Sequence, residues 1–357
     1  MTGPLPDASD AVAGLAALRA SMDNPNNRFN AGADSAAARM KARAPVMLHH
    51  RPKFQLSRTD AVFTMGSCFA RNVEHALIGA GVRVLPEAWE FPPEFMHPDA
   101  AARARLATGH HRHIITRSVL NRYTPASMLN AFQRTLEPDS CSAPQKGLVH
   151  IDEDRWFDPH TKDTALQGLR ESLMVRYLVE EAAKTMHRAS AIFLTLGHTE
   201  TWFDSETGLV LNVAPPPLLI RKAPERFRFA NAAYTNALEA LERIFTLVAR
   251  HIRADMKFIV TVSPVPLNTT FTSRDIVTAN TYSKSVLRSV AETFCNRHAA
   301  ADYFPSYEMV TATHPDLAWD ADRMHVPHAL VESIVARFTA SYFPDLASTP
   351  DAAAVPA

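Results

Sequence analysis

Short apolar runs alternate along this 357-residue chain with longer segments whose apolar residues recur at helical spacing. Alternating strands and helices are typical of an α/β domain, because crossover helices join parallel strands into one sheet. The hydrophobic content of 46% is ordinary for such a domain. The pattern predicts strands at residues 62–65, 82–85, 191–196, 209–213, 257–262 and 301–304, and helices at 69–80, 231–254, 283–297 and 328–343.

The regions outside this alternation suggest a domain plan. Residues 1–50 read as an N-terminal arm with a short helix near residues 35–43, and residues 51–345 as the domain. The interval 89–189 is too long to be structureless, so we expect it to fold as an inserted cap. Small residues and prolines predict a disordered tail at 346–357.

A serine stands at the first junction between a strand and a helix. Ser67 follows the apolar run 61–64, and Gly66 can make the short turn without a Cβ clash. The hydroxyl would then lie at the positive end of the helix dipole, beside unpaired backbone N–H groups. This position suits a nucleophile, although serine before a helix is more often only an N-cap.

An aspartate and a histidine precede the last predicted helix. Asp322 and His325 are three residues apart, so one turn of backbone can direct both side chains the same way. Such a pair suits a histidine that takes a proton from serine while a carboxylate orients its ring. The alternative is that Asp322 caps a turn and His325 is a surface histidine. Glu308 is a further candidate for the orienting carboxylate.

Five ordered motifs resemble the GSCFA family, which is related to the SGNH/GDSL hydrolases. The run 66–70 spells GSCFA, and the resemblance extends from about Phe54 to Phe343. It implies a three-layer, flavodoxin-like α/β fold and acyl transfer through a Ser67–His325–Asp322 triad. The other matching stretches are 195–202, 261–266, 303–308 and the Asp322–His325 pair.

The resemblance also implies an oxyanion site after a central strand. The matching block is 197–200, with Thr199 where these relatives carry asparagine. A hydroxyl reaches less far than an amide, and one such donor supplies about 2.7–4 kcal/mol of transition-state stabilisation. We expect backbone N–H groups of Ser67 and Gly197, with Thr199, to hold the oxyanion; Asn121 and Asn268 are alternative amides.

Other residues are candidates for the pocket wall. Trp202 could stack on a sugar face, although a packing role is the simpler interpretation. Ser263 follows a strand but precedes no immediate helix, so we expect it in the pocket wall, together with Asn121 and Asn268. Cys68 is expected to be buried, with its side chain directed away from that of Ser67.

The interval 89–189 is locally basic. It could form a pocket for an anionic or sugar-bearing substrate, or simply a solvated basic loop. Its histidines lack the spacing and companion residues of a metal site, so we expect no metal. The residues concerned are Arg103, Arg105, His110, His111, Arg112, His113, Arg117 and Arg122.

Charge and cysteine content indicate which partners and which cellular compartment to expect. Lys+Arg and Asp+Glu both number 37, so no global field attracts nucleic acid or anionic membrane. The three cysteines, Cys68, Cys141 and Cys295, form no paired framework. With no signal peptide and no apolar run of about 18 residues, we expect a cytoplasmic protein without a membrane partner.

These observations predict a serine esterase that needs no cofactor. The expected substrate is a small-molecule or glycan O-acyl ester, cleaved through an acyl-enzyme on Ser67. Two alternatives remain open: an O-acyltransferase that acts on a sugar hydroxyl, and a binding protein on a hydrolase scaffold whose triad is vestigial.

Overall fold

A five-stranded parallel sheet forms the centre of the molecule. The computed structural model describes residues 12–30, 32–138 and 145–347. The strands are β1 (Ala61–Gly66), β2 (Arg83–Leu85), β5 (Ala191–Leu196), β9 (Lys257–Val262) and β10 (Ala301–Tyr303). All four pairings between neighbours are parallel. The α/β class and these five predicted strands are therefore confirmed.

The strand order across the sheet is β2-β1-β5-β9-β10. Counted along the chain this is 2-1-3-4-5, the flavodoxin-like order. The direction of winding reverses between β1 and β5, because β2 lies on one side of β1 and the remaining strands lie on the other. In open sheets of this type, ligands bind beyond the carboxyl ends of the strands at such a reversal point.

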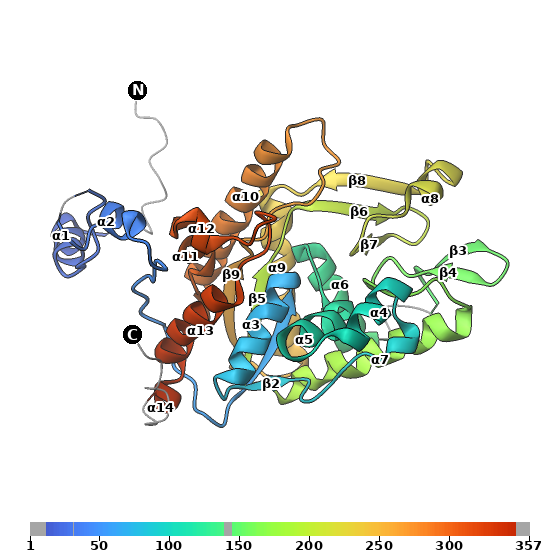
Figure 1. Cartoon of the computed structure of the whole chain (residues 1–357), viewed down its shortest axis with the longest axis horizontal. Helices are drawn as coiled ribbons and strands as arrows, with labels where there is room; N and C mark the ends of the chain where they lie inside the picture. The colour runs from blue at the N-terminus through green and yellow to red at the C-terminus, as the bar shows by residue number, and fades with distance from the viewer. Residues whose placement is uncertain (1–11, 31, 139–144, 348–357) are drawn as a thin grey trace.

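Helices cover both faces of the sheet, because side chains alternate between its faces along each strand. Phe63, Ile192 and Val260 pack in one core with helices α6 (Pro125–Leu136), α9 (Tyr234–His251) and α10 (Ile276–Arg297). Their neighbours Val62, Phe193 and Ile259 pack in a second core with α3 (Cys68–Gly79), α11 (Ser306–Ala312) and α13 (His328–Tyr342). The result is three layers: helices, sheet, helices (Figure 1).

Two predicted helices have different starting points. The residues before α9 form strand β8 (Phe227–Asn231), so that helix begins at Tyr234 and not at 231. Helix α10 begins at Ile276, seven residues before the predicted start, because the Asp275 side chain accepts a hydrogen bond from the N–H of Val277 and caps it there.

A second, smaller sheet lies beyond the end of β5. Its order is β7-β6-β8, with β6 (Glu200–Asp204) paired antiparallel to both β7 (Leu209–Leu211) and β8. The hairpin strand predicted at 209–213 is thus present as β7. Helix α8 (Pro217–Lys222) packs against this sheet through Leu219.

The interval 89–189 is rich in helices. It contains α4 (Pro98–Leu106), α5 (Gly109–Arg117), α6, the hairpin β3 (Val149–Asp152) and β4 (Arg155–Phe157), and α7 (Leu169–Lys184), with short 3₁₀ turns between them. Met128 and Phe132 of α6 lie in the main core. At least this helix therefore belongs to the layer that covers the sheet.

Buried charges fix α3 against α5. The Glu74 carboxylate pairs with the guanidinium groups of Arg71 and Arg117, and all three side chains are almost fully buried. Burial raises the pKa of Glu74, but Arg71, His113 and Arg117 together outweigh this effect and lower it to about 2. The carboxylate therefore stays ionised, and the helix that begins at the first strand end is tied to the interval 89–189.

The N-terminal arm carries α1 (Gly14–Met22) and α2 (Ala36–Lys41) at one end of the molecule (Figure 1). Helix α1 buries no residue. The arm is joined to the domain further along, where Val46 donates its N–H to Thr313 Oγ1 at 2.8 Å. The predicted tail begins inside the last helix, α14 (Pro344–Ala347), and the remainder of it lies outside the described residues.

Candidate active site

A cavity of about 550 Å³ opens at the carboxyl ends of β1, β5 and β9. This size is typical of small-molecule sites. Its wall includes Ser67 after β1, Gly197 after β5 and Ser263 after β9. The cavity therefore lies at the winding reversal between β1 and β5, where the topology favours a ligand site.

Ser67 is the residue before α3 begins, yet its side chain does not cap the helix. The hydroxyl makes no capping hydrogen bond, and its Oγ is buried with no hydrogen-bond partner among the described residues. The side chain is only 3% exposed. A buried hydroxyl without a partner costs free energy, so a structural role for it is poorly supported.

Two positions near Ser67 need glycine, because the backbone of another segment approaches each of them closely. A Cβ on Gly66 would lie 2.6 Å from the carbonyl oxygen of Thr195. A Cβ on Gly197 would lie 2.5 Å from the carbonyl oxygen of Tyr123 and 3.4 Å from Ser67 Cβ. Only glycine lets the ends of β1 and β5 approach their neighbours this closely.

His325 and Asp322 are arranged as a pair before α13. The His325 Nδ1 lies 2.6 Å from Asp322 Oδ2, while Asp322 Oδ1 accepts the N–H groups of Met324 and His325. These backbone hydrogen bonds, with the imidazole contact, lower the pKa of Asp322. An ionised Asp322 favours the proton on Nδ1 and leaves Nε2 of His325 free to act as a base.

Ser67 and His325 line the same cavity, although they lie 258 positions apart in the chain. They are not in hydrogen-bond contact, because Ser67 Oγ has no partner among the described residues. The His325 side chain is 53% exposed on a turn. Catalytic hydrogen bonds are often longer in ligand-free structures and tighten when substrate binds.

Two of the three predicted oxyanion donors, Gly197 and Thr199, are engaged elsewhere. The Gly197 N–H donates to the Tyr123 carbonyl at 3.1 Å. Thr199 does not line the cavity, and its hydroxyl donates to Asn231 Oδ1 at 2.5 Å. The hydroxyl of Thr199 is thus hydrogen-bonded to a strand of the second sheet. The first N–H groups of α3, by contrast, have no acceptor within their own helix.

The predicted wall residues divide into two groups. Trp202, Ser263 and Asn268 line the cavity, whereas Asn121 does not. Trp202 packs edge-on against Phe271, with ring centroids 5.0 Å apart, and its Nε1 is buried without a partner among the described residues. The Asn121 Nδ2 instead donates to the hydroxyl of Tyr123 at 3.3 Å.

Glu308 is not the orienting carboxylate. It accepts hydrogen bonds from Arg288 and Tyr303 at 2.7 and 2.8 Å. Asp322 holds the position beside the His325 ring.

Cys68 also differs from expectation, because it lines the cavity together with Ser67. Burial raises the pKa of its thiol, so the sulfur stays protonated at neutral pH and is a poor nucleophile.

Two lysines in the cavity wall were not predicted. Lys284 on α10 donates to the carbonyls of Gly197 and Val265 at 2.6 and 2.7 Å, and burial lowers its pKa to about 7. Lys162 lies over the Tyr123 ring; burial lowers its pKa, but Tyr123 and Asp163 together outweigh this effect and raise the pKa overall. Lys284 lies on the same face of α10 as the buried residues Leu287 and Ala291, and a charged residue on such an apolar face was a detectable signal.

One carboxylate, Glu200, lines the same cavity. It accepts hydrogen bonds from the Thr270 hydroxyl at 2.5 Å and from the Phe271 N–H at 2.9 Å. The wall near Ser67 therefore carries one carboxylate and two lysines, one of which has its pKa lowered to about 7.

The histidines of the basic interval lie on α5 against α3, where His110 Nε2 is 2.7 Å from Asn72 Oδ1. No group of histidine, cysteine or acidic side chains within the described residues has the arrangement of a metal site. In the same part of the chain, no helix is long and apolar enough to cross a membrane.

Comparison with known proteins assigns the chain to a family. No curated protein and no solved structure matches the chain. A family model does match, over residues 61–338, which span β1, the serine at its end, the cavity wall and most of α13. The chain therefore belongs to the GSCFA family.

Proposed function

We propose that this protein is a serine hydrolase of the SGNH type that cleaves a small O-acyl ester. The observation that carries the proposal is the Ser67 hydroxyl: it is buried, unpaired among the described residues and placed at the start of a helix in the wall of the cavity of about 550 Å³. The same cavity contains a histidine that is already hydrogen-bonded to an aspartate.

In the proposed reaction, Ser67 Oγ attacks the ester carbonyl carbon while His325 Nε2 takes the hydroxyl proton. The tetrahedral intermediate collapses, the bond to the leaving alcohol breaks, and His325 returns the proton to that alcohol. Water then attacks the acyl-enzyme with His325 again as the base. Asp322 stabilises the imidazolium at both stages.

This reaction needs His325 and Ser67 to come into contact. The turn that carries His325 is closed by the Asp320 N–H, which donates to the His325 carbonyl at 2.8 Å. We expect a small movement of this exposed turn, or rotation of the His325 ring, to complete the contact when substrate fills the cavity. The N–H groups at the start of α3 would then hold the oxyanion.

The cavity wall suggests features of the ester. Trp202 and Phe271 offer aromatic surface of the kind that stacks on sugar rings, and Lys162 and Lys284 favour a substrate that carries negative charge. Transfer of the acyl group to a sugar hydroxyl would use the same acyl-enzyme. It differs only in the acceptor that replaces water.

The unformed contact between Ser67 and His325 favours one alternative from a different class, a binding protein with a vestigial triad. Hydrolysis of p-nitrophenyl acetate separates the two. The esterase predicts turnover that falls at least ~100-fold in both Ser67→Ala and His325→Ala while the circular dichroism spectrum is unchanged. Turnover that is absent from the wild type, or equal in wild type and Ser67→Ala, would favour the binding protein.

A further inference from the structure

A second, smaller cavity lies behind the candidate active site. Its volume is about 40 Å³, and it is lined by α6, α7, the loop after β4 and the segment around Arg122. One water molecule needs about 10–15 Å³, so the space suits a few waters or one small ion. Asn212 lines both this cavity and the larger one.

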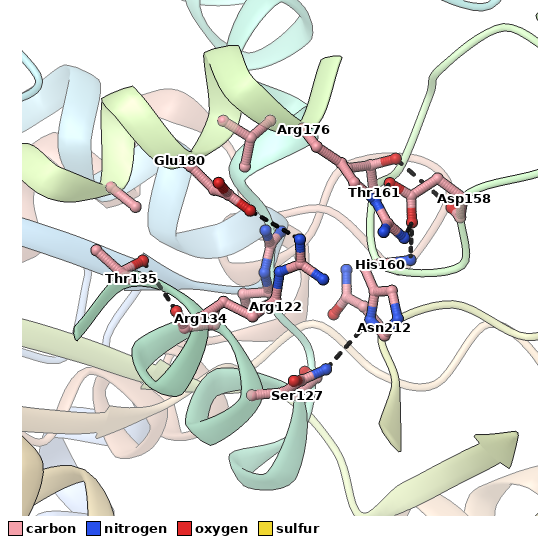
Figure 2. A pocket seen from close by; sticks show the side chains of 14 residues that line it. Arg122, Ser127, Arg134, Thr135, Asp158, His160, Thr161, Arg176, Glu180 and Asn212 are labelled. Atoms are coloured by element: carbon pink, nitrogen blue, oxygen red, sulfur yellow. Dashed lines mark hydrogen bonds and ion pairs between the residues drawn. The ribbon is translucent and has the colours of Figure 1, made fainter. Parts of the chain in front are cut away.

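Five charged side chains line this small cavity, and four of them form two ion pairs. Asp158 accepts two hydrogen bonds from Arg176 at 2.8 and 2.9 Å, and Glu180 accepts one from Arg134 at 2.7 Å. The two pairs lie on either side of the cavity, with Arg122 between them (Figure 2).

Arg122 is the unbalanced charge. Its side chain is only 8% exposed, and it forms no ion pair with a carboxylate among the residues that the structure describes. Nη1 donates to the carbonyls of Val119 and Asn121 at 3.1 and 2.7 Å, while Nε and Nη2 have no acceptor in that part of the chain. Burial lowers the pKa of Arg122 to about 10, which still leaves it charged at neutral pH.

The remaining wall groups do not supply the missing negative charge. His160 Nδ1 accepts from Asn130 Nδ2 at 3.2 Å, and burial lowers its pKa to about 3, so the ring is neutral. Among the described residues of the wall, three guanidinium groups thus face two carboxylates, which leaves one net positive charge. A buried charge without a partner costs several kcal/mol, and this cost would be relieved by an anion.

We propose that this cavity binds one small monovalent inorganic anion, with chloride as the physiological candidate, held by the free face of the Arg122 guanidinium. A single negative charge balances the wall, and an ion of this size fits the volume. Asn212 lines the same space, and while one N–H of its amide donates to the Asn121 carbonyl, the other can complete the coordination.

Such an ion would steady the segment that separates the two cavities. The backbone N–H of Arg122 donates to the carbonyl of Gly66, the residue before Ser67, at 2.8 Å. The Tyr123 carbonyl accepts the backbone N–H of Gly197. Asn212 accepts the Tyr123 N–H and donates to the Asn121 carbonyl. The proposal does not depend on esterase activity.

Crystals of the full chain grown in sodium bromide test the site directly, because bromide has the charge of chloride and scatters anomalously. The expected result is an anomalous peak within about 3.5 Å of the Arg122 guanidinium. Bromide on the outer surface only, or a peak at Arg122 that needs molar salt, would overturn the proposal.

Thermal unfolding gives a second test. Replacing chloride by gluconate, which is too large for the cavity, should lower the Tm of the wild type by about 2 °C at constant ionic strength. Arg122→Met should lose this dependence, whereas Arg250→Met, at an exposed position, should keep it. Equal dependence in both variants would contradict the site; if Arg122→Met does not fold, the bromide experiment on the wild type decides.

Discussion

At the scale of single residues, the site is distinguished by polar groups in unusual environments. Ser67 Oγ and Ser263 Oγ are both buried without partners among the described residues in the wall of one cavity, and Lys284 is buried in the same wall. Native proteins rarely leave such groups unpaired, and the exceptions cluster where ligands bind. These features support a functional site independently of any motif.

The buried ammonium group of Lys284 predicts a pH-dependent stability. Its pKa is lowered from 10.5 to about 7 on folding, so the folded chain binds fewer protons than the unfolded chain between these values. The free energy of unfolding should therefore rise with pH in this window, and the buried charge should cost stability below pH 7.

Lys284→Met removes the titrating group and isolates this effect. The free energy of unfolding of the variant, minus that of the wild type, should be highest near pH ~6.5. This difference should fall by on the order of 2 kcal/mol by pH ~9.5. Urea unfolding of both proteins at the two pH values measures the difference. A difference that does not change with pH would contradict the lowered pKa.

At the scale of elements, the site depends on how closely β1 and β5 approach their neighbours at their carboxyl ends. Gly66 and Gly197 allow that approach, because any side chain there would meet the backbone of Thr195 or Tyr123. Gly79, at the end of α3, has nothing within 4 Å of an added Cβ and provides a matched control.

Alanine substitutions at these three glycines should separate close approach from backbone entropy. Gly66→Ala and Gly197→Ala should each lower the free energy of unfolding by about 1–3 kcal/mol through overpacking. Gly79→Ala should leave it unchanged or raise it by up to about 1 kcal/mol, since alanine is the better helix former. Chemical denaturation provides the comparison, and three equal effects would rule out this explanation.

Some boundaries of strands and helices could be predicted from the sequence, and others could not. Strands β5 and β9 are predicted to the residue, because buried parallel strands are continuous apolar runs between turn residues. The early start of α10 was missed, because Ile276 and Val277 in its first turn are exposed and do not continue the buried face, so that only the Asp275 cap marks the start. The pairing of Asp322 with His325 is local and was therefore predictable from spacing.

Features that depend on distant segments could not be predicted in the same way. The Thr199 hydroxyl is taken by Asn231 and the Gly197 N–H by Tyr123, and both partners come from other parts of the chain. Lys162, which lies in the interval 89–189, reaches the cavity of Ser67 only through the tertiary fold.

At the scale of the whole molecule, the sheet and its two helical layers carry the site, and the described part of the N-terminal arm contributes little before residue 35. Helix α1 buries no residue, whereas His50 Nε2 lies 2.9 Å from the Tyr342 hydroxyl and 3.3 Å from Asp302. The arm is therefore anchored near its end.

Truncation of the arm at two positions should show that only its last part stabilises the domain. A chain that starts at Ser35 should unfold within about 2 °C of the full chain, because few apolar contacts are lost. A chain that starts at Pro52 loses Val46 and His50 and should unfold several degrees lower. Differential scanning calorimetry of the three chains measures this; equal losses in both truncated chains would contradict it.

The central claim is that Ser67 is an activated nucleophile whose base is His325. A fluorophosphonate reagent forms a stable bond only with an activated serine, and peptide mass spectrometry locates the adduct. We predict one adduct, on Ser67, in the wild type and in Ser263→Ala, no adduct in Ser67→Ala, and labelling at least ~100-fold slower in His325→Ala. An unlabelled wild type, an adduct on another serine, or labelling that is unaffected by His325→Ala would contradict the claim.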